Sequence, residues 1–194
     1  MTSHHQPSTP AAADERLLTD RLGLLPVTAA DAETLAEVFD DERMYQFTGG
    51  HPDTLEERRA AYGRIEAGRT NDQDGTAQRN WTVRHRDDGQ AMGMLQAVFA
   101  DGGRSAEIAW AVGLPWQGQG IASEAARAVV AWLETRGVQT ITAHINPDHH
   151  ASIAVARRAG LQPTGEYREH KGTREQLWRR PTATRPNNHS SGPD

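Results

Sequence analysis

The sequence predicts an α/β protein of the α+β kind, with a mixed and mainly antiparallel sheet of about seven strands flanked by about four helices. Short strand-like runs separated by Asp88-Gly89 and by Asp101-Gly102 indicate an antiparallel meander. Residues 123–136 then carry apolar side chains at helical spacing, and the β-branched run 140–145 follows them. A strand, a helix and a further strand in this order predict a β-α-β crossover after the meander.

The other elements have local signals of the same kind. Thr28 and Asp31 have the spacing of a capping box for a first helix, and Thr54 and Glu57 have it for a second. Gly137 marks the end of the long third helix. The expected order is β-α-α-β-β-β-α-β-α-β-β, over residues 22–27, 28–39, 54–68, 80–85, 91–99, 105–112, 123–136, 140–145, 152–159, 164–169 and 175–179.

Length and composition narrow the class of protein. The 194 residues predict one domain over residues 15–180, between polar tails at residues 1–14 and 181–194. The net charge of -5 disfavours a nucleic-acid partner, and the absence of cysteine excludes disulfides, a thiolate nucleophile and thiolate metal ligands. No apolar run is as long as a membrane span, and no signal peptide is recognisable. We therefore expect a cytoplasmic monomer or homodimer without a membrane partner.

The stretch from Glu107 to Ala125 is the most informative part of the chain, because it predicts a strand, a tight loop and the first turn of a helix. The N–H groups at a helix start have no partner within the helix, and the helix dipole adds positive charge there. Gly118 and Gly120 allow a ligand to approach the main chain closely. This order of elements predicts a main-chain site for a phosphate or pyrophosphate.

Gln117, Gly120 and Ala122 form the pattern Gln-x-x-Gly-x-Ala, and the helix that follows begins Gly-x-Ala-x-Glu-Ala. This run resembles the acyl-CoA-binding motif of the GNAT superfamily of N-acetyltransferases, in the branch of the ribosomal-protein N-terminal acetyltransferases. A second block, residues 152–161, resembles the second cofactor helix of that family. The resemblance implies acetyl-CoA as acyl donor and no metal.

The resemblance also implies roles for individual residues. The N–H of Val112 would polarise the thioester, and Glu107 would accept the proton of the amine, directly or through water. A purely structural Glu107 is the alternative. The residues expected to hold the cofactor are Ala111, Val112, Leu114, Gln117, Gly118, Gln119, Gly120, Ile121, Ala122, Ser123, His149 and Ser152.

Two positions depart from the family pattern. Many members have a tyrosine that protonates the leaving thiolate, and this chain has Ala156 there. His149 stands where relatives commonly have an asparagine that contacts the cofactor arm. Ser152 matches the family serine that caps the second cofactor helix.

Aromatic side chains are the candidates for binding the amine acceptor, because they can pack an aliphatic stem or face an amine. These candidates are Tyr45, Phe47, Trp81 and Trp110. Packing in the core is the alternative for all four, and for Trp81 it is the favoured one.

Together these observations predict an N-acetyltransferase that moves an acetyl group to a primary amine by direct transfer in a ternary complex. The acceptor is either a protein N-terminus or a small-molecule amine. Two alternatives stay open: a catalytically inactive relative that binds acyl-CoA, and an interaction module that uses the aromatic loop on a protein partner.

Overall fold

The computed structural model describes residues 15–67 and 77–181. The tail expected over residues 1–14 lies outside the described residues, and so does the tail over 181–194 apart from Pro181. The polar residues 70–79, between the expected second helix and the strand expected over 80–85, lie outside the described residues as far as residue 76.

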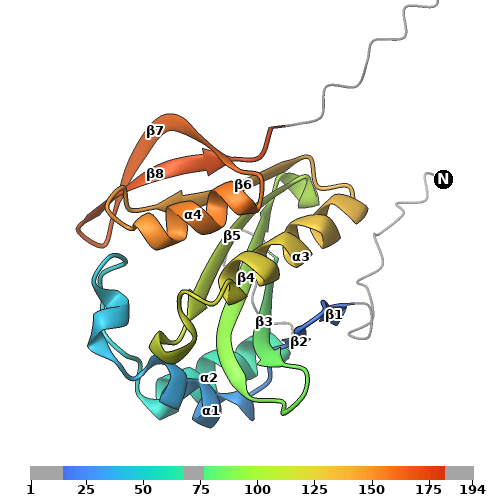
Figure 1. The fold of residues 1–194 in the computed structure, drawn as a ribbon, viewed down its shortest axis with the longest axis vertical. Helices are drawn as coiled ribbons and strands as arrows, with labels where there is room; N and C mark the ends of the chain where they lie inside the picture. Colours follow the sequence, from blue (N-terminus) through green and yellow to red (C-terminus); the bar gives the residue numbers. More distant parts are fainter. Residues whose placement is uncertain (1–14, 68–76, 182–194) are drawn as a thin grey trace, which may run out of the picture.

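The sheet has eight strands in the order β1-β2-β3-β4-β5-β6-β8-β7, and only the β5–β6 pair is parallel (Figure 1). The prediction of a mixed, mainly antiparallel sheet is confirmed. The additional strand is the two-residue β1, at the edge beside β2. The strands span Leu17–Leu18 (β1), Leu22–Pro26 (β2), Gln78–His85 (β3), Ala91–Ala100 (β4), Ser105–Val112 (β5), Thr140–Ile145 (β6), Gln162–His170 (β7) and Thr173–Arg179 (β8).

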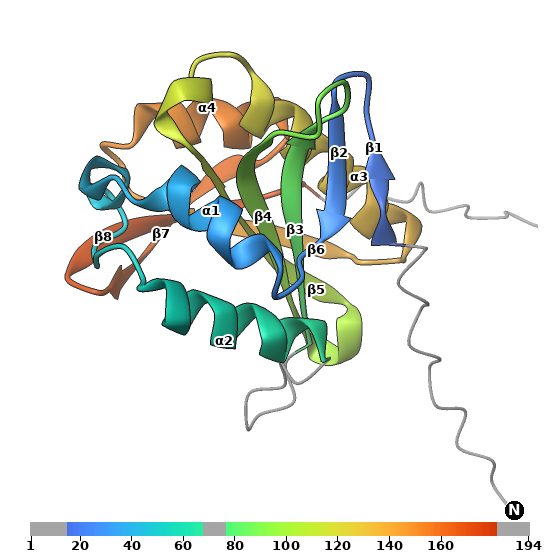
Figure 2. The same cartoon turned by 90° about the horizontal axis from the view of Figure 1, so that it is seen from below.

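Four α-helices cover the two faces of the sheet, α1 and α2 on one and α3 and α4 on the other (Figures 1 and 2). The helices span Asp31–Phe39 (α1), Leu55–Glu66 (α2), Ile121–Thr135 (α3) and His150–Arg158 (α4), and short 3-10 turns span Glu42–Tyr45 (η2), Asp101–Gly103 (η3) and Leu114–Trp116 (η4). The crossover expected between the parallel strands is α3, which connects β5 to β6.

The helix starts show where the local signals held. The capping box expected at Thr28 and Asp31 is wrong as a helix cap, because α1 begins at Asp31 with Ala30 at the cap position and no side-chain cap. The capping box of α2 is present as expected, with Thr54 and Glu57 each accepting a hydrogen bond from the other's backbone. The start of α4 was expected at Ser152, but the helix begins two residues earlier, with His149 at the cap position. No side chain caps α4, so the prediction that Ser152 caps it is wrong. Ser152 lies instead in the first turn of the helix.

The core has two parts, one on each face of the sheet. The larger lies under α3 and α4 and includes Trp81, Ile108 and Leu133. The smaller lies under α1 and α2 and includes Leu35, Phe39 and Tyr62. Residues along β5 alternate between them, since Ile108 packs in the larger cluster and Ala111 against the smaller.

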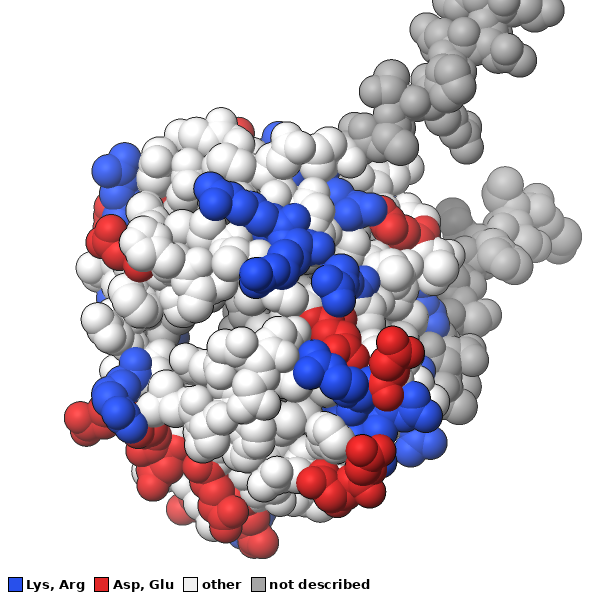
Figure 3. Space-filling view, in the orientation of Figure 1, with Lys and Arg blue, Asp and Glu red and all other residues white. Residues whose placement is uncertain are grey.

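Strands β5 and β6 pair only at their beginnings, where Ser105 to Glu107 lie opposite Thr140 to Thr142. Beyond that point β5 keeps its pairing with β4 as far as Val112, and β6 pairs on its other side with β8. Figure 3 shows the molecule hollowed beside this part of the sheet, below α4 and next to the segment that contains η2. The fold therefore places an opening where the two parallel strands part.

Candidate functional site

The loop between η4 and α3 has the backbone that the motif predicted. Gly118 has a φ of +74° and Gly120 a φ of +80°, in the left-handed region that side chains other than glycine rarely adopt. A Cβ at Gly118 would meet nothing within 4 Å, so the loop is open on that side. Gln119 Nε2 donates a hydrogen bond to the carbonyl of Pro115 at 2.9 Å, which holds the loop against η4.

The backbone N–H groups from Gly118 to Ser123 have no hydrogen-bond partner among residues 15–67 and 77–181. The N–H of Glu124 is the first to find one, at the carbonyl of Gly120, 3.0 Å away. Unsatisfied donors at a helix N-terminus, together with the helix dipole, form a site for an anion. The loop therefore offers a row of donors for phosphate oxygens.

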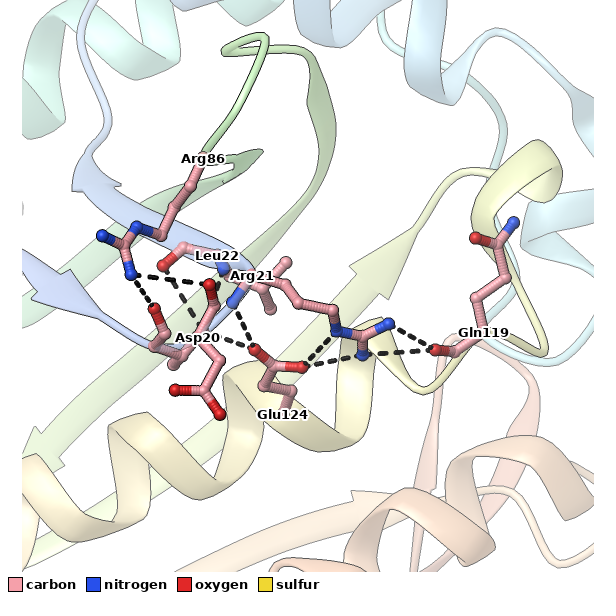
Figure 4. Close-up of polar contacts among 7 residues, drawn as sticks. Asp20, Arg21, Leu22, Arg86, Gln119 and Glu124 are labelled. Atoms are coloured by element: carbon pink, nitrogen blue, oxygen red, sulfur yellow. Dashed lines mark hydrogen bonds and ion pairs between the residues drawn. The ribbon is translucent and has the colours of Figure 1, made fainter.

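Arg21 and Glu124 brace this loop from behind (Figure 4). Arg21 Nε donates to Glu124 Oε2 at 2.9 Å, and both terminal nitrogens of Arg21 lie 3.3 Å from the carbonyl of Gln119. Thr19 donates from its hydroxyl to Glu124 Oε1 at 2.5 Å. Burial alone would raise the pKa of Glu124, but these hydrogen bonds from Thr19 and Arg21 outweigh it and lower that pKa.

The end of β5 presents the main chain of Val112 to the opening. Gly113 donates from its N–H to the carbonyl of Met92 on β4, at 2.9 Å. Successive residues of a strand point their polar groups to opposite edges, so those of Val112 point away from β4, to the side where β6 has parted. Its carbonyl accepts a hydrogen bond from Gln117 Nε2 at 2.9 Å, which agrees with this direction.

Glu107, on β5, lies in a cluster of charged side chains at the point where β5 and β6 part. Its Oε1 is 2.9 Å from Nδ1 of His144 on β6 and 3.2 Å from Nη2 of Arg168 on β7. The imidazole is not aligned for a hydrogen bond at Nδ1, so the first contact is one of proximity. The side chain of Glu107 is about one third exposed, at 37%.

Arg168 connects this cluster to a second carboxylate. Its Nε donates to Oε2 of Glu175 at 2.9 Å, and the side chain of Glu175 is only 9% exposed. One guanidinium thus serves two carboxylates, Glu107 and Glu175. Sequence reasoning missed Arg168 and His144 as partners of Glu107, because the three residues come from three strands and no motif joins them.

Of the expected acceptor-binding residues, Tyr45 and Phe47 lie in or beside η2, at the opening. Tyr45 is partly buried and donates from its hydroxyl to the carbonyl of Phe39 at 3.2 Å. The ring of Phe47 stacks on His149, with centroids 4.4 Å apart and planes 21° apart. Asn146 Nδ2 also donates to the carbonyl of Phe47 at 3.4 Å. The acceptor-side segment therefore contacts the loop that leads into α4.

Burial, and then the charge of His150, lower the pKa of His149 below its ordinary value. The neutral ring is the form that suits a stack against Phe47 in this partly buried place.

Trp81 and Trp110, the two tryptophans among the expected acceptor-binding residues, do not lie beside Tyr45 and Phe47. Trp81 is fully buried in the larger core cluster, its ring edge-on to Trp132, and its Nε1 donates to the carbonyl of Glu15 at 2.6 Å. Trp110 is partly buried and packs against the same cluster, on the α3 and α4 face. Trp81 therefore belongs to the core and Trp110 packs beside it, whereas Phe47 stacks on His149 at the start of α4.

A separate hollow of about 480 Å³ lies between α1, the β3–β4 turn and Trp116, and residues such as Glu37, Arg84 and Gln90 line it. It contains neither Glu107 nor any residue of the 118–123 loop. We therefore place the candidate site where the 118–123 loop, Val112 and Glu107 come together, and not in this hollow.

Exposed arginines gather over α4, where Figure 3 shows a patch of positive charge. Arg157 and Arg158, in the last turn of α4, are both exposed. Within residues 15–67 and 77–181, no cluster of three or more histidine or acidic side chains could hold a metal ion. In the same residues, no helix has the length and apolar character needed to cross a membrane.

Comparison with known proteins agrees with this geometry. Residues 21–162 match the family described as the acetyltransferase (GNAT) domain. Among curated protein sequences, none matches the chain.

Solved structures share the fold at low identity. A GNAT-family acetyltransferase from Bacillus anthracis is 20% identical with a TM-score of 0.72, over 84% of this chain and 96% of that one. The RimL ribosomal L7/L12 α-N-protein acetyltransferase in complex with coenzyme A is 19% identical, with a TM-score of 0.72, over 85% and 97%. AAC(6')-Ib in complex with paromomycin and acetyl-CoA is 18% identical, with a TM-score of 0.68, over 83% and 93%.

Proposed function

The chain belongs to the GNAT acetyltransferase family, and from this premise we propose that it transfers an acetyl group from acetyl-CoA to a primary amine. The row of unpartnered N–H groups from Gly118 to Ser123 is the observation that carries the proposal. Those donors and the dipole of α3 would bind the pyrophosphate of the cofactor. The loop contains no lysine or arginine, so the main chain supplies most of the binding.

The remaining cofactor contacts follow from the same placement. The pantetheine arm would lie in the gap between β5 and β6, beside the main chain of Ala111, Val112 and Leu114. His149 and Ser152, at the start of α4, would border the gap from the other side. The arginines on α4 would add favourable charge for the phosphates.

The reaction would begin with the neutral amine, since an ammonium has no lone pair. As the nitrogen attacks, Glu107 takes one proton from it, directly or through water, and Arg168 holds the carboxylate in place. The nitrogen attacks the thioester carbonyl, and the N–H of Val112 stabilises the oxyanion that forms. The C–S bond then breaks, and the thiolate leaves.

Two features of the chain shape this mechanism. Because it has no cysteine, no acetyl-cysteine intermediate can form, and the acetyl group passes directly to the amine. Ala156 is fully buried and can donate no proton, so the thiolate leaves as such or takes a proton from water. The acceptor would be a protein N-terminus, as the name of the RimL enzyme indicates for that protein, or a small-molecule amine.

Calorimetric titration with acetyl-CoA tests the cofactor assignment. Gly120→Glu would place a carboxylate among the donors of the loop, and we expect it to abolish binding. Gly137→Glu is the matched control, because Gly137 also has a left-handed backbone, with a φ of +78°, and lies at the far end of α3. Binding that survives Gly120→Glu, or is absent from the folded unmodified protein, would overturn the proposal.

Acetyl transfer itself needs a second measurement, loss of the thioester in the presence of an amine panel. A protein that binds acetyl-CoA but transfers to no amine would support the inactive acyl-CoA-binding alternative. A folded protein that does not bind acetyl-CoA would favour an interaction module instead.

A further inference from the structure

Arg58, on α2, is a buried cation that the reaction above does not use. The residue is only 4% exposed. Its guanidinium lies over the ring of Phe39, 5.6 Å from the centroid, and Nη1 donates to the hydroxyl of Tyr62 at 3.4 Å. The side chain of Tyr45 also lies near it. All of these neighbours are uncharged aromatic side chains.

The other two nitrogens of the guanidinium, Nε and Nη2, are buried and have no hydrogen-bond partner among the described residues. These two atoms form one edge of the planar group, and their N–H bonds point the same way. In proteins, this edge of a guanidinium typically binds a carboxylate through two parallel hydrogen bonds. Arg21 uses the same pair of atoms on Glu124 in this protein.

Arg58 differs in this respect from the other buried charged residues of the described chain. Glu15 is paired with Arg79, Asp31 with Arg84, and Glu175 with Arg168. No carboxylate lies within 4.0 Å of Arg58 in the parts of the chain that the structure describes. A buried charge without a counter-ion is costly to the folded state, so its unpaired edge calls for an anionic partner from outside the chain.

The position of Arg58 indicates which partner that is. Phe39 ends α1, and Tyr45 belongs to η2, whose neighbour Phe47 stacks on His149 beside the opening. Arg58 therefore lies behind the segment proposed to bind the amine acceptor, on the α1 and α2 face of the sheet. It lies away from the loop of residues 118–123, which is proposed to bind the cofactor phosphates.

We propose that Arg58 binds a carboxylate of the amine acceptor through Nε and Nη2, so that the acceptor class is an amine that also carries a carboxylate, such as an amino acid or a short peptide. This inference rests on the proposed acetyl transfer and narrows its acceptor. Tyr45 lies near both Phe39 and Arg58, so its side chain adjoins the proposed carboxylate site.

The test uses matched acceptors that differ only in the anion. Free amino acids and glycyl dipeptides are compared with their carboxamides, on the full-length protein loaded with CoA, by calorimetry for binding. The same pairs are then compared for kcat/KM with acetyl-CoA. We expect at least about tenfold tighter binding of the carboxylate member to the unmodified protein, and loss of that preference in Arg58→Gln.

Three variants make the result specific. Arg58→Lys keeps the charge but lacks the two-pronged edge, so it should recover only part of the preference. Arg59→Gln is the control, because Arg59 is the exposed neighbour on α2 and pairs with Glu33. If Arg58→Gln does not fold, Arg58→Lys and Tyr45→Phe carry the comparison.

Each outcome bears on one proposal or the other. Equal binding of acids and amides by the unmodified protein, or a preference that Arg58→Gln retains, overturns the assignment of Arg58 and leaves acetyl transfer standing. Arg58-dependent binding of carboxylates without any loss of thioester supports the assignment and overturns acetyl transfer.

Discussion

Nδ1 of His144 lies 2.9 Å from Oε1 of Glu107, so an imidazole from β6 meets the carboxylate on β5 just where these two parallel strands part. Arg168 contacts the same carboxylate from β7. The carboxylate is thus fixed between a cation and a titratable ring, while about a third of the side chain is open to solvent or substrate. A fixed but accessible carboxylate is the arrangement that a proton acceptor needs.

Replacing Glu107 with glutamine should lower the rate of acetyl transfer by about 10²–10³-fold. Glutamine keeps the shape of the side chain but cannot take the proton, so the affinity for acetyl-CoA should not change. Steady-state kinetics and calorimetry check the two halves of this expectation. Glu166→Gln is the control, because Glu166 is an exposed glutamate on β7. Its carboxylate makes only a loose ion pair with Arg179, at 3.8 Å. Undiminished activity of the Glu107→Gln enzyme would show that Glu107 has only a structural role.

Replacing Gly93 with alanine should destabilise the protein by about 1–3 kcal/mol. A Cβ on Gly93 would collide with the main chain of Ala111 on β5, and backbone cannot move aside as a flexible side chain can. Gly23→Ala is the matched control on β2, where a Cβ would meet only Leu18, at 3.8 Å. Urea denaturation of both variants measures the difference. Equal stabilities would mean that β4 and β5 adjust to the added methyl group.

Replacing Glu124 with glutamine should cost about 1–2 kcal/mol of stability at pH 7, because Arg21 and Thr19 lose their charged partner. The native state lowers the pKa of Glu124 below its ordinary 4.5. The stabilisation is therefore complete above pH 4.5 and is lost as the pH falls through the lower native value. Denaturation at several pH values should show the two proteins converging in acid. A difference in stability between the two proteins that stays constant with pH would contradict an ionic origin of the stabilisation.

Replacing His149 with phenylalanine should make the stability less sensitive to acid. The native pKa of His149 lies below its ordinary 6.5, so the native state favours the neutral ring. Stability that depends on the neutral ring is complete above pH 6.5 and is lost as the pH falls toward the native pKa. In the variant, the phenylalanine ring can stack on Phe47 in place of the imidazole and has no group that titrates. We expect the wild type to lose more stability than the variant between pH 7.5 and pH 5.5.

A second substitution separates this effect from general acid denaturation. His170→Gln changes an exposed histidine on β7, and its stability should follow the wild type at both pH values. Chemical denaturation of the three proteins decides the matter, and parallel curves for all three would contradict a role of the His149 ring.

Apart from the two-residue β1, the order of the strands and α-helices could be predicted because each carried a local signal. The capping box at Thr54, the hairpin at Asp88-Gly89 and the strand, loop and helix around Gly120 all depend on residues close in sequence. Tertiary contacts could not be predicted in this way. The sequence favoured the core over a site for Trp81, but it could not show which side chain packs against it, and that partner is Trp132 on α3.

The charged partners show the same limit more clearly. Arg168 is 61 residues from Glu107, and nothing in the spacing joins them. Arg58 stands in an ordinary run of charged residues on α2, and only the structure shows that it is buried without a counter-ion. The error at Ser152 has another cause: the helix starts without a side-chain cap, so the usual signal for its first residue is absent.

The parting of β5 from β6 gives an interior strand the character of an edge strand. Amides of β5 that point to β4 are held in the ladder, whereas those of Trp110 and Val112 face the gap and have no strand to bond. In hydrogen–deuterium exchange the two sets should differ, with slow and fast amides alternating along a strand in the middle of an eight-stranded sheet. An occupant of the gap would slow the fast set alone, so the exchange of these few amides can report on cofactor binding without any catalytic turnover.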